Sequence, residues 1–292
     1  MLFSHSWKFY FQVPGADAMS YITPLWIPDE NIPQCIAHQI STNHQYTHLY
    51  LPLKLTPHTD LSKQFLSDIS KAADPCILLN MRKLEKLEVV DQREGKVSTI
   101  EKRQLGPTKL QTQPTVIFED LTFIDLMGSM VQLSTLEGNR IFRVYTCQID
   151  VPSTIEQQRN PTTTLTLTFP CEHDYDLTAN VYTGLPVCDL GFNFMFNARF
   201  HLVTSRENVR ENVPFNTYLR DHISTLFVYL LLNDADLRKD ISRYCPSSNN
   251  HKVKHSSWWL SMLDRINQLI TKHLSVLFDI RTGKVFLCFF FT

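Results

Sequence analysis

Glycine is scarce in this chain, and charge of either sign is never in excess. The 292 residues include only 8 glycines, and 28 Lys and Arg residues against 29 Asp and Glu residues leave a formal net charge of -1. Balanced charge gives no global basis for binding nucleic acid or an anionic membrane, so neither is expected as a partner. The sequence also has no apolar run long enough for a membrane-spanning helix, which needs roughly 18 residues. The very apolar end at 285–292 is far shorter than this.

Paired cysteines are absent as well. The seven cysteines are odd in number, widely scattered, and include no Cys-x-x-Cys pair. This spacing argues against a secreted disulfide framework. Near the start, Lys8, Gln12 and Pro14 interrupt the apolar core that a cleaved signal peptide needs. We therefore expect an intracellular protein, cytoplasmic or nuclear.

Apolar periodicity predicts an α+β fold with mixed or antiparallel sheets layered with helices. Several predicted strands come between two helical regions, and this order is typical of a sheet covered by helices. In the strand expected at 162–169, threonines alternate with Leu165 and Leu167. The predicted strands are 3–11, 49–53, a strand plus a turn within 76–90 that includes the apolar run 76–79, 116–118, 140–148, 162–169 and 177–182, with hairpin strands in 91–114; the predicted helices are 59–73, 214–232 and about 258–274.

The stretch 190–219 carries the most informative pattern. Phe192, Phe194 and Phe196 recur at every second residue, which is the period of a strand with one buried face. The apolar pattern breaks at the sequence Ser-Arg-Glu-Asn at 205–208, where charged and hydrogen-bonding groups stand together. A helix that opens with proline is expected next, because proline suits the first helical turn.

Two blocks of sequence resemble one family, in the same order. The first block comprises FSHSWKFYF (3–11), YITPLWIPDE (21–30), YTHLYLPLK (46–54) and FLSDISKAADPCILLNMRKLEKLEV (65–89). The second is GFNFMFNARFHLVTSRENVRENVPFNTYLRDHI (191–223). Together they resemble the sacsin-like and NO VEIN-like large proteins, whose shared module is a Bergerat-type ATPase domain of the gyrase, heat-shock chaperone, histidine kinase and MutL group. The resemblance covers most of residues 3–232, with a weaker match in the middle.

This resemblance implies three parts: a C-terminal remnant of the ATPase domain at 1–55, a transducer-like α+β domain at 56–232, and a helical tail with an apolar end at 233–292. The matched blocks begin after the place where the family's catalytic acid, metal-binding asparagine and adenine-reading Asp-x-Gly loop would stand. The glycine-rich lid is missing too, because no Gly-x-Gly triplet occurs. Of the Gly-Thr pair that follows the lid in such proteins, only Thr47 is kept, and the resemblance places it near adenine or its loop.

The resemblance also assigns a role to the polar break. In the chaperone branch, a Ser-Arg-Glu sequence at a strand end of the second domain supplies a charged residue to the terminal phosphate of the nucleotide. By this resemblance Arg206 contacts phosphate, and Ser205 lies beside it at the nucleotide. A guanidinium suits the role because it is permanently charged and grips two phosphate oxygens at once. The alternative is a solvated turn with an exposed Arg206–Glu207 pair.

The leading hypothesis is an incomplete chaperone-like ATPase module that is catalytically inactive alone and acts in coupling or protein interaction, with protein partners. ATP and Mg²⁺ are expected as cofactors only if the missing half is supplied. A second hypothesis is a protein that binds and hydrolyses ATP once it is completed by upstream residues or by a partner. A third is a nucleic-acid-associated scaffold that uses Trp258, Trp259 and the neighbouring basic residues, which the balanced charge does not favour.

Other chemistry has less support. Residues 171–174, read as CEHD, and Cys245 with the two histidines after it contain ligand-type side chains, but structural zinc needs four ligands at tight paired spacing. We interpret both groups as ordinary loop residues. No Gly-x-Ser-x-Gly elbow for acyl transfer occurs. Trp258 and Trp259 are expected to pack into a core or a partner's groove rather than stack on bases.

Overall fold

A computed structural model describes ten stretches of the chain: 9–12, 19–22, 74–81, 83–91, 96–110, 112–155, 161–172, 177, 179–245 and 256–273. Two compact units are present, Met1–Ser62 and Lys63–Thr292. In the first unit, β1 (Phe9–Gln12) and β2 (Met19–Ile22) form an antiparallel hairpin. The strand predicted at 49–53, the helix predicted at 59–73 and the apolar end at 285–292 lie outside the described residues.

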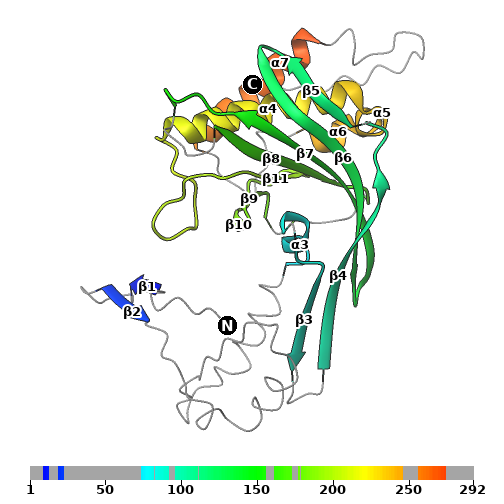
Figure 1. The fold of residues 1–292 in the computed structure, drawn as a ribbon, viewed down its shortest axis with the longest axis vertical. Coiled ribbons are helices and arrows are strands. Elements are labelled where there is room, and N and C mark those ends of the chain that lie inside the picture. The colour runs from blue at the N-terminus through cyan, green and yellow to red at the C-terminus, as the bar shows by residue number, and fades with distance from the viewer. Residues whose placement is uncertain are drawn as a thin grey trace. The chain divides into compact units, whose positions relative to one another are not determined.

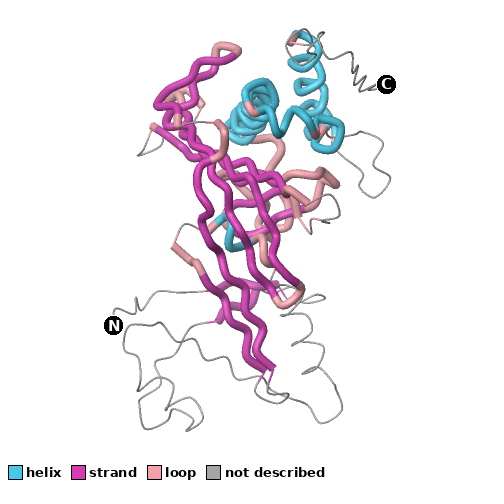
Figure 2. Tube along the Cα trace, turned by 90° about the vertical axis from the view of Figure 1, so that its right-hand side faces the viewer, coloured by secondary structure: helices cyan, strands magenta, loops and turns pink. Residues whose placement is uncertain are grey.

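The second unit is built on a nine-stranded sheet (Figures 1 and 2). Its strands lie in the order β10-β9-β11-β8-β7-β6-β4-β3, and β5 pairs with β6. All pairs are antiparallel except β11 and β9, which are parallel. The predicted α+β class is therefore confirmed. The strands are β3 (Lys86–Asp91), β4 (Lys96–Pro107), β5 (Gln113–Phe118), β6 (Leu121–Thr135), β7 (Gly138–Asp150), β8 (Thr162–Pro170), β9 (Val181–Thr183), β10 (Leu185–Cys188) and β11 (Met195–Asn197).

Helices cover one face of this sheet, which we call the helix-covered face. The long helix α4 (Pro214–Asn233) lies on the strands, and α7 (Ser257–Lys272) packs against it (Figure 1). Two short helices, α5 (Ala235–Lys239) and α6 (Ile241–Tyr244), follow α4. None of the described helices is long and apolar enough to span a membrane. The helices predicted from 214 and around 258 are confirmed within two residues at their starts.

Aromatic rings fill the layer between β8 and α4. Every second side chain of β8 points to the helix-covered face, and its leucines are fully buried there together with Phe169. The Phe169 ring centroid lies 6.0 Å from that of Phe227 in α4, and the Phe194 centroid lies 4.7 Å from that of Phe227. Burial of these large rings contributes much of the hydrophobic stabilisation of the unit.

Because α4 is enclosed by the sheet on one side and by α7 on the other, it is buried around most of its circumference. Arg220, which is 8 % exposed, joins α4 to α7. Its Nη1 donates to the Trp258 carbonyl at 2.8 Å, and its guanidinium lies 4.9 Å from the centroid of the Trp258 ring. A cation held in this way keeps the two helices in one register.

On the opposite face of the sheet, which we call the open face, the described residues cover only part of the area. The single-turn helix α3 (Ile77–Asn80) buries Leu78 and Leu79 against a smaller cluster that includes Val131, Phe142 and Tyr182. The hydroxyl of Tyr182 donates to Asp74 Oδ2 at 2.7 Å, just before α3. Beside α3, the described residues of this face line a cavity.

The strand predicted at 76–79 is wrong, because these residues form α3. The side chain of Asp74 accepts a hydrogen bond from the Cys76 backbone N–H at 2.9 Å, and the Asp74 carbonyl accepts from Ile77 N–H at 3.0 Å. Asp-Pro at 74–75 therefore starts a helical turn. The apolar run is buried on the open face rather than threaded into the sheet.

The predicted strand 177–182 is shorter than expected, because β9 begins only at Val181. Asn180, just before it, donates its backbone N–H to the Cys188 carbonyl at 3.1 Å and accepts from the Phe196 N–H at 2.8 Å, and its side chain bonds the segment 190–194. Its Oδ1 accepts from Leu190 N at 2.9 Å and Phe192 N at 3.1 Å, and its Nδ2 donates to the carbonyls of Phe192 and Phe194. Asn180 is fully buried. The same bonds explain why β11 spans three residues although its phenylalanines alternate: the buried face is confirmed, and the long strand is not.

Candidate functional site

The Ser-Arg-Glu sequence at 205–207 lies at the tip of a short hairpin loop. An isolated bridge pairs Leu202 with Val209, and the backbone N–H of Val203 donates to the Asn208 carbonyl at 3.0 Å. Inside this loop the Arg206 N–H donates to the Val203 carbonyl at 2.9 Å. All residues from 204 to 208 are exposed. The structure therefore brings Ser205 and Arg206 together at a solvent-facing tip, and Thr47 lies outside the described residues.

The base of this hairpin is fixed to the first turn of α4 by one buried amide. Asn216 Oδ1 accepts from the His201 N–H at 2.8 Å, and Asn216 Nδ2 donates to the carbonyls of His201 and Arg210, each at 2.8 Å. Asn216 is completely buried. Its amide thus joins both strands of the hairpin to the helix. Sequence reasoning missed this residue, because an asparagine in the first turn of a helix is common and carries no functional signal by itself.

Arg206 combines an unusual backbone with an unpartnered side chain. Its φ of +62° lies in the left-handed region, which non-glycine residues seldom adopt. Within the described part of the chain, its guanidinium forms no hydrogen bond or ion pair. A guanidinium in this state presents five N–H donors to solvent and suits bidentate binding of a phosphate or carboxylate.

One Asp-x-Gly triplet does occur, at 189–191, downstream of the place that the ATPase family uses for adenine. Asp189 Oδ1 accepts a hydrogen bond from the Gly191 N–H at 2.7 Å, and Gly191 has a φ of +66°. This is a local turn that leads into the buried phenylalanines. The triplet therefore has a structural explanation.

Among the described residues, no group of three or more His, Cys, Asp or Glu side chains is arranged to hold a metal ion. The two described members of the CEHD segment contact the sheet instead. Glu172 Oε1 accepts from the Ile141 N–H at 2.9 Å, and Arg143 Nη1 donates to Cys171 Sγ at 3.4 Å. Burial raises the pKa of the Cys171 thiol. The histidines and the aspartate considered with these cysteines lie outside the described residues.

Trp258 and Trp259 both form contacts within the described part of the chain. Trp259 is 5 % exposed, and its ring packs against Phe196 and Phe200 with centroid distances of 5.9 Å and 6.4 Å. Trp258 donates its indole N–H to Thr217 Oγ1 at 3.1 Å. The expectation of core packing is confirmed for Trp259, and Trp258 is partly buried against the same core.

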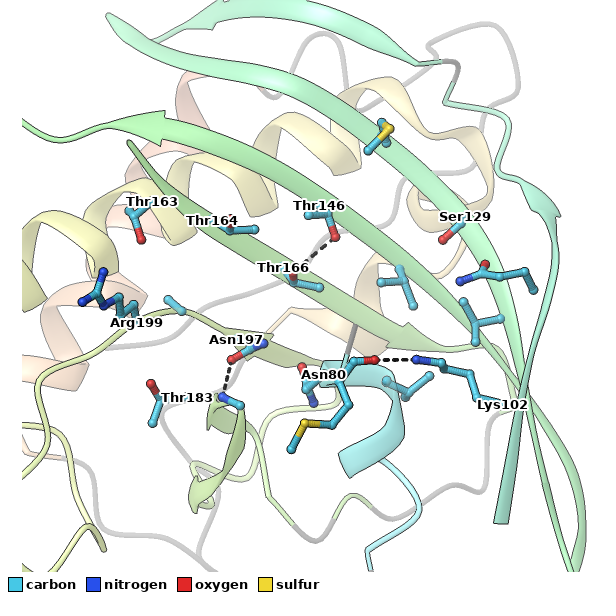
Figure 3. A pocket seen from close by; sticks show the side chains of 18 of the residues that line it. Asn80, Lys102, Ser129, Thr146, Thr163, Thr164, Thr166, Thr183, Asn197 and Arg199 are labelled. Atoms are coloured by element: carbon cyan, nitrogen blue, oxygen red, sulfur yellow. Dashed lines mark hydrogen bonds between the residues drawn. The ribbon is translucent and has the colours of Figure 1, made fainter. Parts of the chain in front are cut away.

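A second candidate lies on the open face, beside α3, and sequence reasoning did not identify it. It is a cavity of about 550 Å³, which we call the threonine-lined hollow (Figure 3). Arg199 and Lys102 lie at opposite ends of the hollow, and threonines of β7 and β8 lie between them. The residues that matter for its chemistry are Lys102, Thr146, Thr164, Thr166, Asn197 and Arg199.

Several polar groups of the hollow are already held by internal bonds. Lys102 Nζ donates to the carbonyls of Leu78 at 2.9 Å and Met81 at 2.5 Å, and burial lowers the pKa of this lysine. Asn197 Oδ1 accepts from the Gly184 N–H at 2.9 Å. These bonds fix the walls of the hollow. The sequence signal for it is the alternation of threonine with leucine in β8, which places the hydroxyls on the open face.

Comparisons of the chain with protein families, with curated proteins and with solved structures found no match.

Proposed function

We propose that this chain is the non-catalytic, coupling part of an ATPase-related protein of the sacsin-like and NO VEIN-like kind. In this role the hairpin tip presents Arg206 to a phosphate group that is held by another part of the protein or by a partner protein. The chain by itself does not hydrolyse ATP. ATP and Mg²⁺ bind only when the missing half of the site is supplied.

One observation carries this proposal: the Arg206 guanidinium is exposed and unpartnered at the tip of a hairpin whose base is fixed to α4. A structural arginine usually forms bonds within its own chain, as Arg220 does with Trp258. A fixed base and a free cation are the features that a phosphate-contacting arm needs, because preorganisation lowers the cost of binding.

The absence of a Gly-x-Gly lid supports a non-catalytic role for the chain alone. In the family it resembles, lid backbone encloses the phosphates of the nucleotide. An arginine can stabilise charge that develops on a transferred phosphoryl group, but it does not position the attacking water or the metal. Arg206 would therefore contribute only to a site that other residues complete. The alternative function, a complete ATPase formed with upstream residues or a partner, uses the same arginine.

The first test is a calorimetric titration of the chain with ATP and Mg²⁺. We expect no saturable binding, because the arm alone contacts only the terminal phosphate. Tight magnesium-dependent binding to the chain alone would sink the proposal.

The second test supplies the missing half as an ATPase domain of the same family, fused upstream or added in trans. We expect Arg206→Ala to lower ATP turnover by roughly 10³-fold, as loss of a phosphate-contacting arginine does elsewhere. Arg210→Ala is the matched control, since Arg210 is exposed at the base of the same hairpin. Equal effects of the two substitutions, or no effect of either, would refute a specific role for Arg206.

A further inference from the structure

The lining of the threonine-lined hollow has one sign of charge. None of its described lining residues is acidic, whereas Arg199 and Lys102 are both cationic. A concave surface with unbalanced positive charge concentrates anions. The same charge disfavours cationic ligands and metal ions, which need carboxylate or other oxygen-rich partners.

Arg199 is the group that is available to receive an anion. It lies two residues after the end of β11 and is exposed, and its side chain forms no hydrogen bond or ion pair with the described residues. Lys102 differs, since it already donates to two backbone carbonyls and retains one N–H. The two cations therefore differ: Lys102 holds α3 against the sheet, and Arg199 keeps its N–H donors unused by the described residues.

Hydroxyl groups line the floor of the hollow between the two cations (Figure 3). The Oγ1 atoms of Thr146 in β7 and Thr166 in β8 are 3.2 Å apart and share one hydrogen bond. Since a hydroxyl has one donor and two acceptor positions, this pair keeps hydrogen-bonding capacity for a ligand. The described lining contains no aromatic ring on which a base could stack.

We propose that the threonine-lined hollow binds a small polyol phosphate, with the phosphate on Arg199 and ligand hydroxyls on Thr146 and Thr166. The charge of the lining selects the anion, its hydroxyls match a polyol, and its lack of aromatic rings argues against a nucleotide. The volume of about 550 Å³ lies within the usual range of small-molecule sites. This site is separate from the hairpin tip and does not depend on the function proposed for Arg206.

Calorimetric titration tests the proposal with three probes: ribose 5-phosphate, ribose and inorganic phosphate. Ribose 5-phosphate is expected to bind at least ten times more tightly than either fragment, because only the ester engages Arg199 and the threonines together. Arg199→Gln should weaken its binding at least tenfold, and Thr166→Val, which keeps the side-chain shape, at least threefold. Arg103→Gln is the matched control: Arg103 is exposed on β4 and does not line the hollow.

Several outcomes would overturn the proposal. They are no binding of ribose 5-phosphate at 10 mM concentration, equal binding of inorganic phosphate and the ester, or equal losses in Arg199→Gln and Arg103→Gln. Binding of an extended acidic peptide in the absence of sugar phosphate binding would instead identify the hollow as a peptide groove. Thermal unfolding of each variant separates loss of the site from loss of the fold, because the exposed arginine variants are expected to retain the unfolding midpoint of the unchanged chain.

Discussion

At the scale of single residues, the backbone of Arg206 is as informative as its side chain. Its φ of +62° places it in a conformation that costs a non-glycine residue about 1 kcal/mol. The hairpin keeps this residue left-handed through the hydrogen bond from its N–H to the Val203 carbonyl. Strain of this kind clusters at functional sites, which agrees with the proposed role of the tip.

We expect Arg206→Gly to be more stable than Arg206→Ala by about 0.5–1 kcal/mol, since glycine adopts the left-handed conformation without a Cβ penalty. Urea denaturation of the two variants measures the difference. Both lack the guanidinium, so both should lose the same ATP turnover in the completed enzyme. Equal free energies of unfolding would show that position 206 is unstrained.

Two asparagines show what residue-level sequence reasoning missed. Asn180 and Asn216 are fully buried, and each bonds backbone groups of a neighbouring segment of the chain. In a sequence, a buried asparagine looks like any loop asparagine, because its partners are backbone atoms of any residue type. Arg206 could be singled out because a family pattern surrounds it, whereas these supporting residues follow only from the fold.

At the scale of elements, β6 is the longest strand and it was not predicted. Its pairing with β7 shifts register between Ile124 and Met127, and Asp125 there has a φ of +50°. This irregularity shifts the alternation of side chains between the two faces of the sheet by one residue. Phe123 and Leu126 therefore face the same side although they are three residues apart. Strands with unbroken alternation, such as β8, were predicted with nearly correct bounds.

The apolar run at 76–79, which forms α3, was wrongly predicted as a strand for a different reason. Four consecutive apolar residues are compatible with a buried strand or a buried helical turn. Hydrogen bonds from Asp74 select the turn, and burial of Leu78 and Leu79 against the sheet stabilises it. Periodicity could not distinguish the two, and Asp-Pro at 74–75 was interpreted only as the end of the helix predicted before it.

Gly128 in β6 is required by close packing on the helix-covered face. A Cβ at this position would lie 2.1 Å from Thr108 Oγ1 and 2.9 Å from Cε1 of Tyr145. The ring of Tyr145 has little freedom to move, since its hydroxyl donates to the buried Asp234 at 2.5 Å, and burial raises the pKa of that hydroxyl. We expect Gly128→Ala to lower the free energy of unfolding by about 1–3 kcal/mol, measured by urea denaturation.

The neighbouring substitution Ser129→Ala is the control for this prediction. Ser129 points to the hollow rather than the core, so its loss should cost less than about 0.5 kcal/mol. Adding Thr108→Ala to Gly128→Ala should restore part of the lost stability by removing the nearest atom. If Gly128→Ala is as stable as Ser129→Ala, the packing around this strand is looser than the structure describes.

At the scale of the whole molecule, α4 lies at the centre of the large core. It contacts β8, α5 and α7, and the hairpin base is bonded to its first turn. His222 lies at the centre of this helix and is 3 % exposed. Its Nδ1 lies 2.9 Å from the Tyr218 carbonyl, and its ring packs against that of Phe123. Global stability is therefore sensitive to the charge state of this histidine.

Burial lowers the pKa of His222 below its ordinary value, and the nearby Arg265 lowers this pKa further. The Tyr218 carbonyl and Asp221 raise the pKa, but their effects are smaller than that of burial. The unfolded chain then binds a proton at higher pH than the folded chain does. The stabilising effect of neutral His222 is complete above about pH 6.5 and falls as the pH drops through that value toward the folded pKa.

Measuring the free energy of unfolding between pH 7.5 and 5.5 tests this linkage. We expect the unchanged chain to lose up to about 1.4 kcal/mol more per pH unit than His222→Gln does, since the variant has no titrating group at this position. The other histidines are common to both proteins and cancel in the comparison. Parallel pH profiles would show that His222 does not control acid stability.

The alternation of leucine and threonine in β8 also constrains how the chain folds. A slip of one residue against β7 would push hydroxyls among phenylalanine rings and turn the two leucines toward water. Such a slipped pairing would lose stability on both faces of the sheet at once, so β8 strongly favours a single pairing register. The strand that forms the floor of the hollow therefore also selects the correct pairing register while the sheet assembles.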